Sequence, residues 1–561
     1  MGFPTLPSLI GIFFLIASGF AEKAPYSFVR EGTSAPPVEY SDYIVVGGGT
    51  AGTPLAATLS AATAKVLLLE RGGQPYGNPS VTNINGFGRT LADPSPTSPA
   101  QQFVTADGVF NNRPRILGGG TAVNAGFYSR AEPEFLSRLG LEPRLVEESY
   151  RWVEDKIVFR PLVRQWQAGF RGGLVEAGVV PDRGFTYEHL MGTKVGGTIF
   201  DENGTRHSAA DLLEYANSNN IVVYLNSIVQ KILFRTSPGQ KPKAIGVIFK
   251  DSAGVLHEAR LNNGSSNEII VASGALGSPP LLMMSGIGPG RQLQAHQIPI
   301  VLRQPYVGRN MVDNPFNGVI FPSRRQLEYS LVEVAGLPDT NNYLESISMS
   351  LNFSALHASA QNYAKIANTT LPTFEIPNNI YLPSGVNTTT PFQAGQLLEK
   401  IKTPFSKGDI ELENRDPDRT QRVTFNYLKD SRDVASCVEG LKIIKRVTES
   451  NSLSSFRYPL ASFTTYLALG LAFPTNLNVK RLSSLYSLSH YCVDTVRTTW
   501  HYHGGCQAGK VVDRDYKVIG VDALRVVDAS TYDQSPGTNP QATIMMLGRY
   551  MGIKILQQRS N

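Results

Sequence analysis

The chain has 561 residues, of which 42% are hydrophobic and 17% are charged, and its formal net charge is +6. This is the composition of an ordinary globular protein, and the length suits two to four domains around a large core. There is no run of Lys or Arg with interleaved aromatic residues, so the sequence gives no indication of a nucleic-acid partner.

Positions 1–21 form an apolar leader that ends in the small-residue site Gly19-Phe20-Ala21. Its apolar run at positions 9–17 is too short to span a bilayer, so we expect a cleaved signal peptide. A buried N-terminal helix is the alternative, because no Lys or Arg precedes the run. No later run of about 20 apolar residues follows, so we expect no membrane span. Residues 22–40 are polar, contain Pro36-Pro37, and are interpreted as a linker.

Sequons and cysteines fit a secreted glycoprotein, extracellular or in the cell wall. Five N-glycosylation triplets begin at Asn203, Asn263, Asn352, Asn368 and Asn387. The three cysteines, Cys437, Cys492 and Cys506, are too few for a disulfide scaffold. They permit one bridge and one free thiol in an oxidising compartment.

Residues 41–73 are predicted to form a strand, a glycine turn, a helix and a second strand. The apolar run at 42–46 leads into Gly47-Gly48-Gly49-Thr50-Ala51-Gly52. In such a G-x-G-x-x-G the first glycine makes the turn, the second admits a pyrophosphate, and the third lets the helix pack on the strand. A helix at about 50–62 and a strand at 65–69 follow, with Glu70 at the strand's tip.

The separation in sequence between Gly52 and Glu70 is near the spacing of a carboxylate that binds ribose hydroxyls. The order of these features predicts a dinucleotide site, and the alternative is a glycine-rich turn in another α/β unit. Arg71 could meet a 2′-phosphate, but Glu70 beside it would repel that group. FAD or NAD is therefore favoured over NADP.

The segment from 72 to 272 mixes loops, helices and strands. Residues 72–107 are predicted to be a long loop over the cofactor. The glycine run at 115–126 suits a backbone that passes close to a planar ligand, although it could equally be a plain glycine loop. Helices are predicted at 143–155 and 162–177, and strands at 221–225, 228–234, 244–249 and 268–272.

The amino-acid composition changes at about residue 318, where segments rich in Asn, Thr and Ser begin. Strands at 346–353 and 421–427, with helices near Leu397 and at 434–448, predict a separate α+β substrate domain over 318–477. The cofactor domain then covers 41–317, with an excursion near 130–200, and resumes at 478–561. The predicted fold is α/β, with a discontinuous Rossmann-like FAD-binding domain and an α+β substrate domain that carries an antiparallel sheet.

Several motifs resemble one family. Residues 274–289 closely resemble the second signature of the glucose-methanol-choline (GMC) oxidoreductases, and residues 115–126 resemble the first. The C-terminal Trp500-His501-Tyr502-His503-Gly504-Gly505 is also similar, and the resemblance spans about residues 40–555. Within the family the chain looks most like the plant branch that contains HOTHEAD and the mandelonitrile lyases, through 501–506 and 547–552. The resemblance implies FAD, bound noncovalently or covalently.

The resemblance also implies roles for matching residues. The ADP-ribose is expected at Thr50, Ala51, Glu70 and Arg71, and the isoalloxazine beside Thr121, Asn124, Ala125, Gly126 and Phe127. The Val229 backbone is expected to meet adenine. The remaining expected cofactor residues are Gly47, Gly49, Gly52, Trp500, Asp528, Ala529, Pro540 and Gln541. The sequence contexts of Cys437 and Cys492 resemble the bridge of the plant lyases, so Cys506 is expected to be free.

His501 is the candidate base, because an imidazole of near-neutral pKa can take the hydroxyl proton while hydride leaves the same carbon. A structural histidine in a strand is the alternative. His501 and His503 would share one strand face, but no third metal ligand is visible, so we expect no metal. Asn539 could cap the helix that starts at Pro540, or could bond the substrate oxygen as in oxidising relatives. That helix would direct its positive end at the flavin.

These features predict an FAD-dependent enzyme that oxidises an alcohol to an aldehyde by hydride transfer to flavin N5. The alternatives are a mandelonitrile lyase that keeps FAD as structure, and a non-catalytic flavoprotein. The plant lyases carry a second His where Asn539 stands and a Tyr where Thr499 stands, which favours oxidation here. We expect the substrate to be a small-molecule alcohol or cyanohydrin. We expect the protein to be a monomer.

Overall fold

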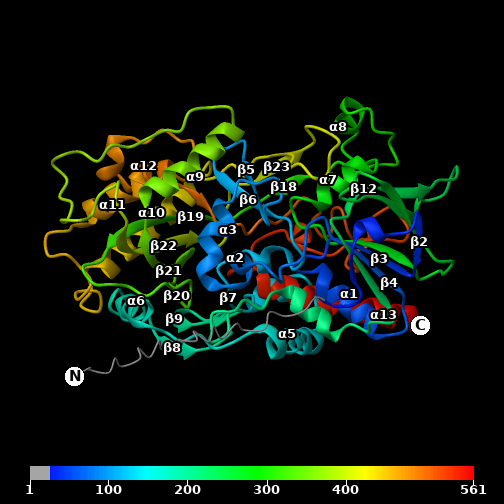
Figure 1. Ribbon diagram of the computed structural model, residues 1–561, viewed down its shortest axis with the longest axis horizontal. Coiled ribbons are helices and arrows are strands. Elements are labelled where there is room, and N and C mark those ends of the chain that lie inside the picture. The colour runs from blue at the N-terminus through cyan, green and yellow to red at the C-terminus, as the bar shows by residue number, and fades with distance from the viewer. Residues whose placement is uncertain (1–25, 561) are drawn as a thin grey trace, which may run out of the picture.

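The computed structural model describes residues 26–560, so the predicted signal peptide and the first residues of the predicted linker lie outside it. The molecule is elongated, with one large sheet in each half and helices around both (Figure 1). One sheet is parallel and the other is largely antiparallel, which confirms the predicted fold class. No helix in the described part of the chain is long and apolar enough to cross a membrane.

A six-stranded parallel sheet occupies the half that contains the C-terminus (Figure 1). In spatial order its strands are β1 (Val29–Glu31), β11 (Ile221–Leu225), β4 (Val66–Leu69), β3 (Tyr43–Val46), β15 (Glu268–Val271) and β26 (Leu524–Val526). Helix α1 (Gly52–Ala61) joins β3 to β4, and these two strands are parallel neighbours. The predicted strand, turn, helix and strand at 41–73 are therefore confirmed.

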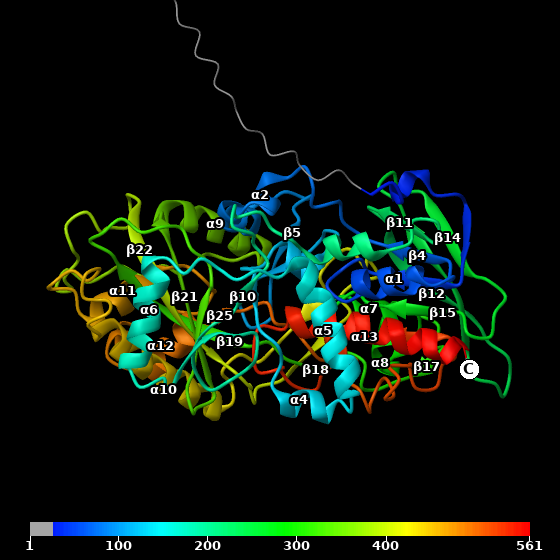
Figure 2. The same ribbon diagram turned by 90° about the horizontal axis from the view of Figure 1, so that it is seen from below.

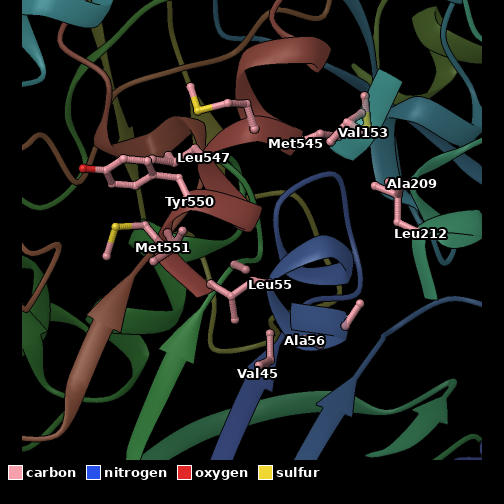
Figure 3. Packing of buried hydrophobic residues seen from close by; sticks show 14 of the residues in the cluster. Val45, Leu55, Ala56, Val153, Ala209, Leu212, Met545, Leu547, Tyr550 and Met551 are labelled. Atoms are coloured by element: carbon pink, nitrogen blue, oxygen red, sulfur yellow. The ribbon is translucent and has the colours of Figure 1, made fainter. Parts of the chain in front are cut away.

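Both faces of the parallel sheet are buried, as its uninterrupted apolar strands require. On one face Val45 belongs to a core with Leu55 of α1 and Met551 of α13 (Gln541–Ser560), as Figure 3 shows. On the other face Ile44 belongs to a second core, shared with a four-stranded sheet. Complete burial of each such side chain contributes about 1.5–3 kcal/mol. The glycine turn between β3 and α1 is thus held by rigid layers.

The four-stranded sheet runs in the order β12 (Ile228–Arg235), β13 (Lys243–Lys250), β14 (Leu256–Leu261) and β2 (Val38–Ser41). Strands β1 and β2 come from the segment interpreted as a linker, and that interpretation is wrong for them. Val29 pairs with Val223, and Val38 pairs with Glu258. Both are short edge strands with mostly exposed or half-exposed side chains. They join through backbone hydrogen bonds, which leave no hydrophobic pattern in the sequence.

A seven-stranded sheet forms the other half. In order, its strands are β25 (Arg497–Thr498), β19 (Pro315–Pro322), β22 (Phe392–Ile401), β21 (Asn342–Leu351), β20 (Val334–Leu337), β9 (Gly192–Val195) and β8 (Asp182–Phe185). All neighbours are antiparallel except β8 and β9. β8, β9 and β25 come from the 130–200 excursion and the C-terminal return, so segments assigned to the cofactor domain build part of this sheet.

The central strand β22 corrects the prediction of a helix near Leu397. The Gln-Leu-Leu-Glu-Lys sequence there favours a helix locally, but β22 is paired on both sides, with β19 and β21. Leu397 packs in the core under helix α10 (Ser431–Glu449), whereas Gln396, Leu398 and Lys400 line a cavity on the opposite face. Tertiary pairing therefore overrides local propensity at this strand.

Helices cover the face of the seven-stranded sheet that lies opposite this cavity (Figure 2). They are α6 (Gln165–Glu176), α10, α11 (Phe463–Ala472) and α12 (Leu488–Thr495). Cys437 of α10 is bonded to Cys492 of α12, and Cys506 is free and buried. The predicted helices at 162–177 and 434–448 and the predicted disulfide are confirmed.

Other segments are more ordered or shorter than predicted. The predicted loop at 72–107 contains α2 (Pro79–Thr82), α3 (Phe87–Ala92) and β5 (Ala100–Val104), which pairs with β6 (Phe110–Pro114). The predicted strand at 421–427 shrinks to β24 (Arg422–Val423). Further elements are β7 (Phe127–Tyr128), α4 (Pro133–Arg138), α5 (Pro143–Ile157), β10 (Gly197–Thr198), α7 (Ser278–Met284), β16 (Ile287–Gly288), α8 (Gly290–Ala295), β17 (Leu302–Arg303), β18 (Arg309–Met311), α9 (Phe353–Ile366) and β23 (Gly408–Glu411).

Candidate active site

A cavity of about 900 Å³ lies between the two large sheets. It brings together most of the residues that the sequence predicts for a site, although they come from distant parts of the chain. The predicted residues that line it are Gly47, Gly49, Thr50, Ala51, Glu70, Arg71, Asn124, Ala125, Gly126, Phe127, Val229, Trp500, His501, Asp528, Ala529, Asn539, Pro540 and Gln541.

Gly52 and Thr121 do not line the cavity. A Cβ on Gly52 would lie 1.9 Å from Gly47 O, so this glycine permits close packing of α1 on the turn. Thr121 Oγ1 donates to Gly118 O at 2.7 Å and accepts from Ala209 N at 2.8 Å. The Thr121 side chain therefore holds the glycine run to the 3₁₀ helix Ala209–Tyr215, and its place beside the isoalloxazine stays a prediction.

Glu70 lies at the end of the cavity that the glycine turn forms. Its carboxylate accepts from Gly48 N at 2.9 Å and from Gly72 N at 2.8 Å. Burial raises the pKa of this carboxyl, and the two N–H donors oppose the increase. Each oxygen keeps a second lone pair for a ribose hydroxyl. Helix α1 begins beside the cavity without a side-chain cap. Thr53 N donates to Gly49 O and Pro54 has no N–H, so the main-chain N–H groups of residues 50–52 are the ones that can hold a pyrophosphate.

Three arginines gather beside Glu70. Arg71 lies 3.1 Å from Asp418, and Arg115 also pairs with Asp418. Arg113 is buried next to them, and its burial lowers its pKa. Burial also lowers the pKa of Arg71, to about 10. Three cations around two carboxylates leave an excess of positive charge, which suits a bound pyrophosphate.

The two glycine runs cross in the cavity wall. A Cβ on Gly119 would lie 2.7 Å from Gly49 Cα, so the two backbones approach where no side chain fits. Asn124 Nδ2 donates to Gln541 Oε1 at 2.9 Å, and Gln541 Nε2 donates to Phe127 O at 2.6 Å. The start of α13 is thus fixed against the second run. Bare backbone and a helix N-terminus together fit a planar ring that gains electrons.

A buried carboxylate fixes the segment that carries His501. Asp313 Oδ1 accepts from His501 N at 2.8 Å, and Oδ2 accepts from Thr498 Oγ1 at 2.6 Å and from Tyr427 OH at 2.7 Å. Trp500 has a φ of 59°, which a bulky side chain rarely adopts. Such strain persists where surrounding contacts over-determine it, typically at functional sites. Since β25 ends at Thr498, His501 follows the strand, and the strand position considered for it is wrong.

The surroundings of His501 favour the uncharged form of its imidazole. Burial, the Lys400 ammonium and His503 lower the pKa of His501 well below its usual value. Nδ1 is buried and has no hydrogen-bond partner among the described residues, so the ring can act in the cavity only through Nε2. His503 Nδ1 contacts His501 O at 2.9 Å. Residues 26–560 contain no group of three or more His, Cys, Asp or Glu that could hold a metal.

Asn539 lies just before α13, and its oxygen is not a helix cap. Asn539 Oδ1 accepts from Lys400 Nζ at 3.1 Å, while Pro540 O accepts from Ile544 N at 2.9 Å. The N-cap alternative for Asn539 is therefore wrong. Lys400 also pairs with Glu345 Oε1 at 3.3 Å. Burial lowers the pKa of Lys400, and Glu345 opposes the decrease.

No motif in the sequence predicts the cavity wall away from the glycine runs, which includes Lys400 and Glu345. Its apolar residues include Phe110, Tyr329, Met349, Leu351, Leu356, Tyr363 and Phe473. The signal was present: positions 345, 347, 349 and 351 of β21, and 396, 398 and 400 of β22, alternate toward the cavity. Because a helix is predicted near Leu397, this alternation is not interpreted as a strand.

The nucleotide cradle, the glycine crossing and the histidine beside them define a flavin-dependent oxidoreductase class. Family models described as GMC oxidoreductase match residues 41–316 and 404–548. The chain belongs to the GMC oxidoreductase family, and FAD is its cofactor.

Three curated relatives match over nearly their full length. Protein HOTHEAD of Arabidopsis thaliana is 45% identical, over 97% of this chain and 92% of that protein. The (R)-mandelonitrile lyase-like protein of Arabidopsis thaliana is 44% identical, over 95% and 92%. Sinalpyl alcohol oxidase Nec3 of Nesocodon mauritianus is 37% identical, over 98% and 95%. The chain is therefore similar to proteins named for oxidation and for lysis, and the choice between them depends on the site residues.

Proposed function

We propose that this protein oxidises an alcohol to an aldehyde, with His501 as the base that takes the hydroxyl proton. The observation that supports this most directly is the position of His501, whose imidazole lines the cavity and can present Nε2. Burial lowers the pKa of this imidazole, which favours the neutral form. A neutral imidazole accepts a proton, whereas a charged one cannot. FAD, when bound, supplies the acceptor for the hydride.

The remaining residues hold the reactants. Asp313 fixes the His501 segment through the main-chain N–H, and the strained Trp500 is held in place by the same contacts. Asn539 offers a hydrogen bond to the substrate oxygen. The N-terminus of α13, at Pro540 and Gln541, lines the cavity, and its positive end stabilises negative charge that develops there.

The cavity wall indicates the kind of alcohol. Aromatic and aliphatic side chains from β21, α9 and the 473 region line the side away from the glycine runs. An apolar wall favours an alcohol whose hydroxyl is attached to an apolar body, such as a benzylic or long primary alcohol. The polar groups at the His501 end then select the hydroxyl.

Lysis of mandelonitrile is the second candidate, because a lyase-like relative is 44% identical. Two residues oppose it. The resemblance implies a Tyr in the lyases where Thr499 stands, and here Thr499 Oγ1 donates to Asn314 O at 2.6 Å. It also implies a His in the lyases where Asn539 stands, and an amide does not titrate near neutral pH. A non-catalytic flavoprotein is the third candidate, and no observation favours it.

Secretion is part of the proposal. A disulfide joins Cys437 to Cys492, which is typical of proteins that fold in an oxidising compartment. The sequon residues Asn203, Asn263, Asn352 and Asn368 are exposed. Digestion of protein secreted from plant cells with an N-glycosidase should increase its mobility on a gel. Unchanged mobility and retention inside the cell would both count against secretion.

Anaerobic mixing of the FAD-loaded protein with a panel of alcohols tests the function. We expect at least one benzylic or primary alcohol to bleach the flavin, and His501→Ala to slow bleaching about 10²–10⁴-fold. Wild-type protein should release negligible benzaldehyde from mandelonitrile. Efficient release, with the flavin oxidised in the presence of every alcohol, would make lysis the correct function.

A further inference from the structure

We propose that Lys400, paired with Glu345, is a positioning residue that turns the Asn539 side chain so that only its N–H₂ group faces the substrate oxygen. The inference rests on the proposed alcohol oxidation and concerns the same cavity. Lys400 and Glu345 lie on strands β22 and β21 of the antiparallel sheet. Both are far in sequence from His501 and Asn539, and neither belongs to one of the family motifs.

The sheet register places the pair. Lys400 of β22 lies directly opposite Tyr343 of β21, and Glu345 is two residues further along the same face. The Lys400 ammonium is 3.3 Å from Glu345 Oε1, 3.1 Å from Asn539 Oδ1 and 4.1 Å from the centroid of the Tyr343 ring. One carboxylate, one amide oxygen and one aromatic face therefore surround it.

Burial makes these contacts obligatory. Lys400 is 2% exposed and Glu345 is 6% exposed, so each charge has little solvent around it and depends on the other. An unpaired charge in such a place is strongly destabilising. The ammonium is therefore held, and the amide that it contacts is held with it.

The contact fixes the orientation of the amide. An ammonium group only donates hydrogen bonds, so the Asn539 atom that it contacts is the oxygen. The nitrogen is then the free end of the amide, and Asn539 Nδ2 has no acceptor among residues 26–560. An N–H₂ group can donate to the substrate oxygen but cannot take its proton. The hydroxyl proton therefore goes to His501 Nε2, while Asn539 stabilises the charge left on the oxygen.

Lys400 has a second effect, on the charge of His501. Burial, the Lys400 ammonium and His503 lower the pKa of His501, in that order. Asp313 faces the His501 main chain from the other side, and Glu345 lies beyond Lys400. Removal of the Lys400 charge should raise the pKa of His501, and removal of the Glu345 charge should lower it further. The two variants should thus act in opposite directions.

Three variants test the proposal through flavin reduction by a substrate alcohol at several pH values. In Lys400→Met the plateau rate should fall about 10–100-fold and the acid limb should move up by about one pH unit. Lys400→Arg keeps the charge and should recover most of the rate. Glu345→Gln should move the acid limb down. The flavin spectrum and melting temperature of each variant verify folding.

A double variant tests whether Lys400 acts through Asn539. On the pH plateau His501 is neutral in every variant, so only the amide effect remains. Lys400→Met should then change the rate less than about threefold in an Asn539→Ala background. An equally large loss in both backgrounds, or a Lys400→Arg variant no better than Lys400→Met, would overturn the positioning role.

A measurement without substrate separates this inference from the proposed function. Diethyl pyrocarbonate modifies neutral imidazole, and peptide mass spectrometry reports the modification of His501. As the pH is lowered, the rate should fall at a lower pH in the wild type than in Lys400→Met. Identical pH profiles would overturn the electrostatic effect of Lys400. If no alcohol bleaches the wild-type flavin but these profiles differ, the proposed function fails and the effect of Lys400 on His501 stands.

Discussion

Asp313 and His501 are joined by a 2.8 Å hydrogen bond in which a buried carboxylate accepts from a main-chain N–H. The bond holds the backbone and leaves the imidazole free. The base is therefore positioned through its peptide group, and its ring nitrogen Nδ1 has no partner among the described residues.

Asp313→Asn should weaken this arrangement, because an amide presents a donor where the carboxylate accepts from Thr498, Tyr427 or His501. We expect the rate of flavin reduction to fall about 10–100-fold while the flavin stays bound. Tyr427→Phe removes one donor and keeps the carboxylate, so its rate should stay within about threefold of wild type. Equal losses in both variants would show that Asp313 has no special role.

The pH profile should reflect the depressed pKa of His501. The neutral imidazole is the active form, and a lowered pKa keeps it neutral to lower pH. The rate of flavin reduction should therefore stay on its plateau as the pH falls through 6.5 and should decline only below that. Stopped-flow reduction at several pH values measures the profile. An acid limb above pH 6.5 would contradict a buried, uncharged base.

The crossing of the glycine runs should not tolerate a side chain. In Gly119→Ala the new Cβ would lie 2.7 Å from Gly49 Cα, and the φ of +56° adds strain. We expect loss of most bound flavin and a destabilisation of about 1–3 kcal/mol. Gly73→Ala is the matched control, because nothing lies within 4 Å of its Cβ. The ratio of flavin to protein absorbance measures the first effect, and equal ratios in both variants would reject it.

The disulfide should stabilise the helices that cover the seven-stranded sheet. Cys437 and Cys492 are 55 residues apart in sequence and join α10 to α12. Replacing both with Ala should cost about 2–4 kcal/mol and lower the unfolding temperature. A reducing agent should lower the unfolding temperature of the wild type and not of the variant. Cys506→Ala should keep the bridge, and peptide mapping that finds Cys506 in a disulfide would contradict this arrangement.

The half of the molecule that contains the parallel sheet is well predicted, because the sequence patterns that indicate it lie close together in the chain. The glycine turn, α1 and Glu70 follow each other in one short stretch of the chain, and each has its own chemical signature. Parallel strands buried on both faces also give uninterrupted apolar runs. Most of the cofactor residues named from motifs therefore line the cavity.

The substrate half is less predictable, because its structure depends on pairing between distant strands. β22 has a helix-favouring sequence, and only pairing with β19 and β21 makes it a strand. The role of Lys400 can be inferred only from its contacts with Glu345 and Asn539, which the fold brings together. Strands β1 and β2 were missed for a related reason, since edge strands join through backbone groups and need no apolar pattern.

The order of the strands has a consequence for biosynthesis. Strand β26 and helix α13 are made last, yet β26 forms one edge of the parallel sheet and α13 packs on α1 in the core beneath it. Domains are synthesised from the N-terminus, so the glycine turn of β3 leaves the ribosome long before its supporting layer exists. We therefore expect FAD to be enclosed only after translation is complete. A chain that ends before residue 524 is expected to lose the cofactor, even though its N-terminal fingerprint is complete.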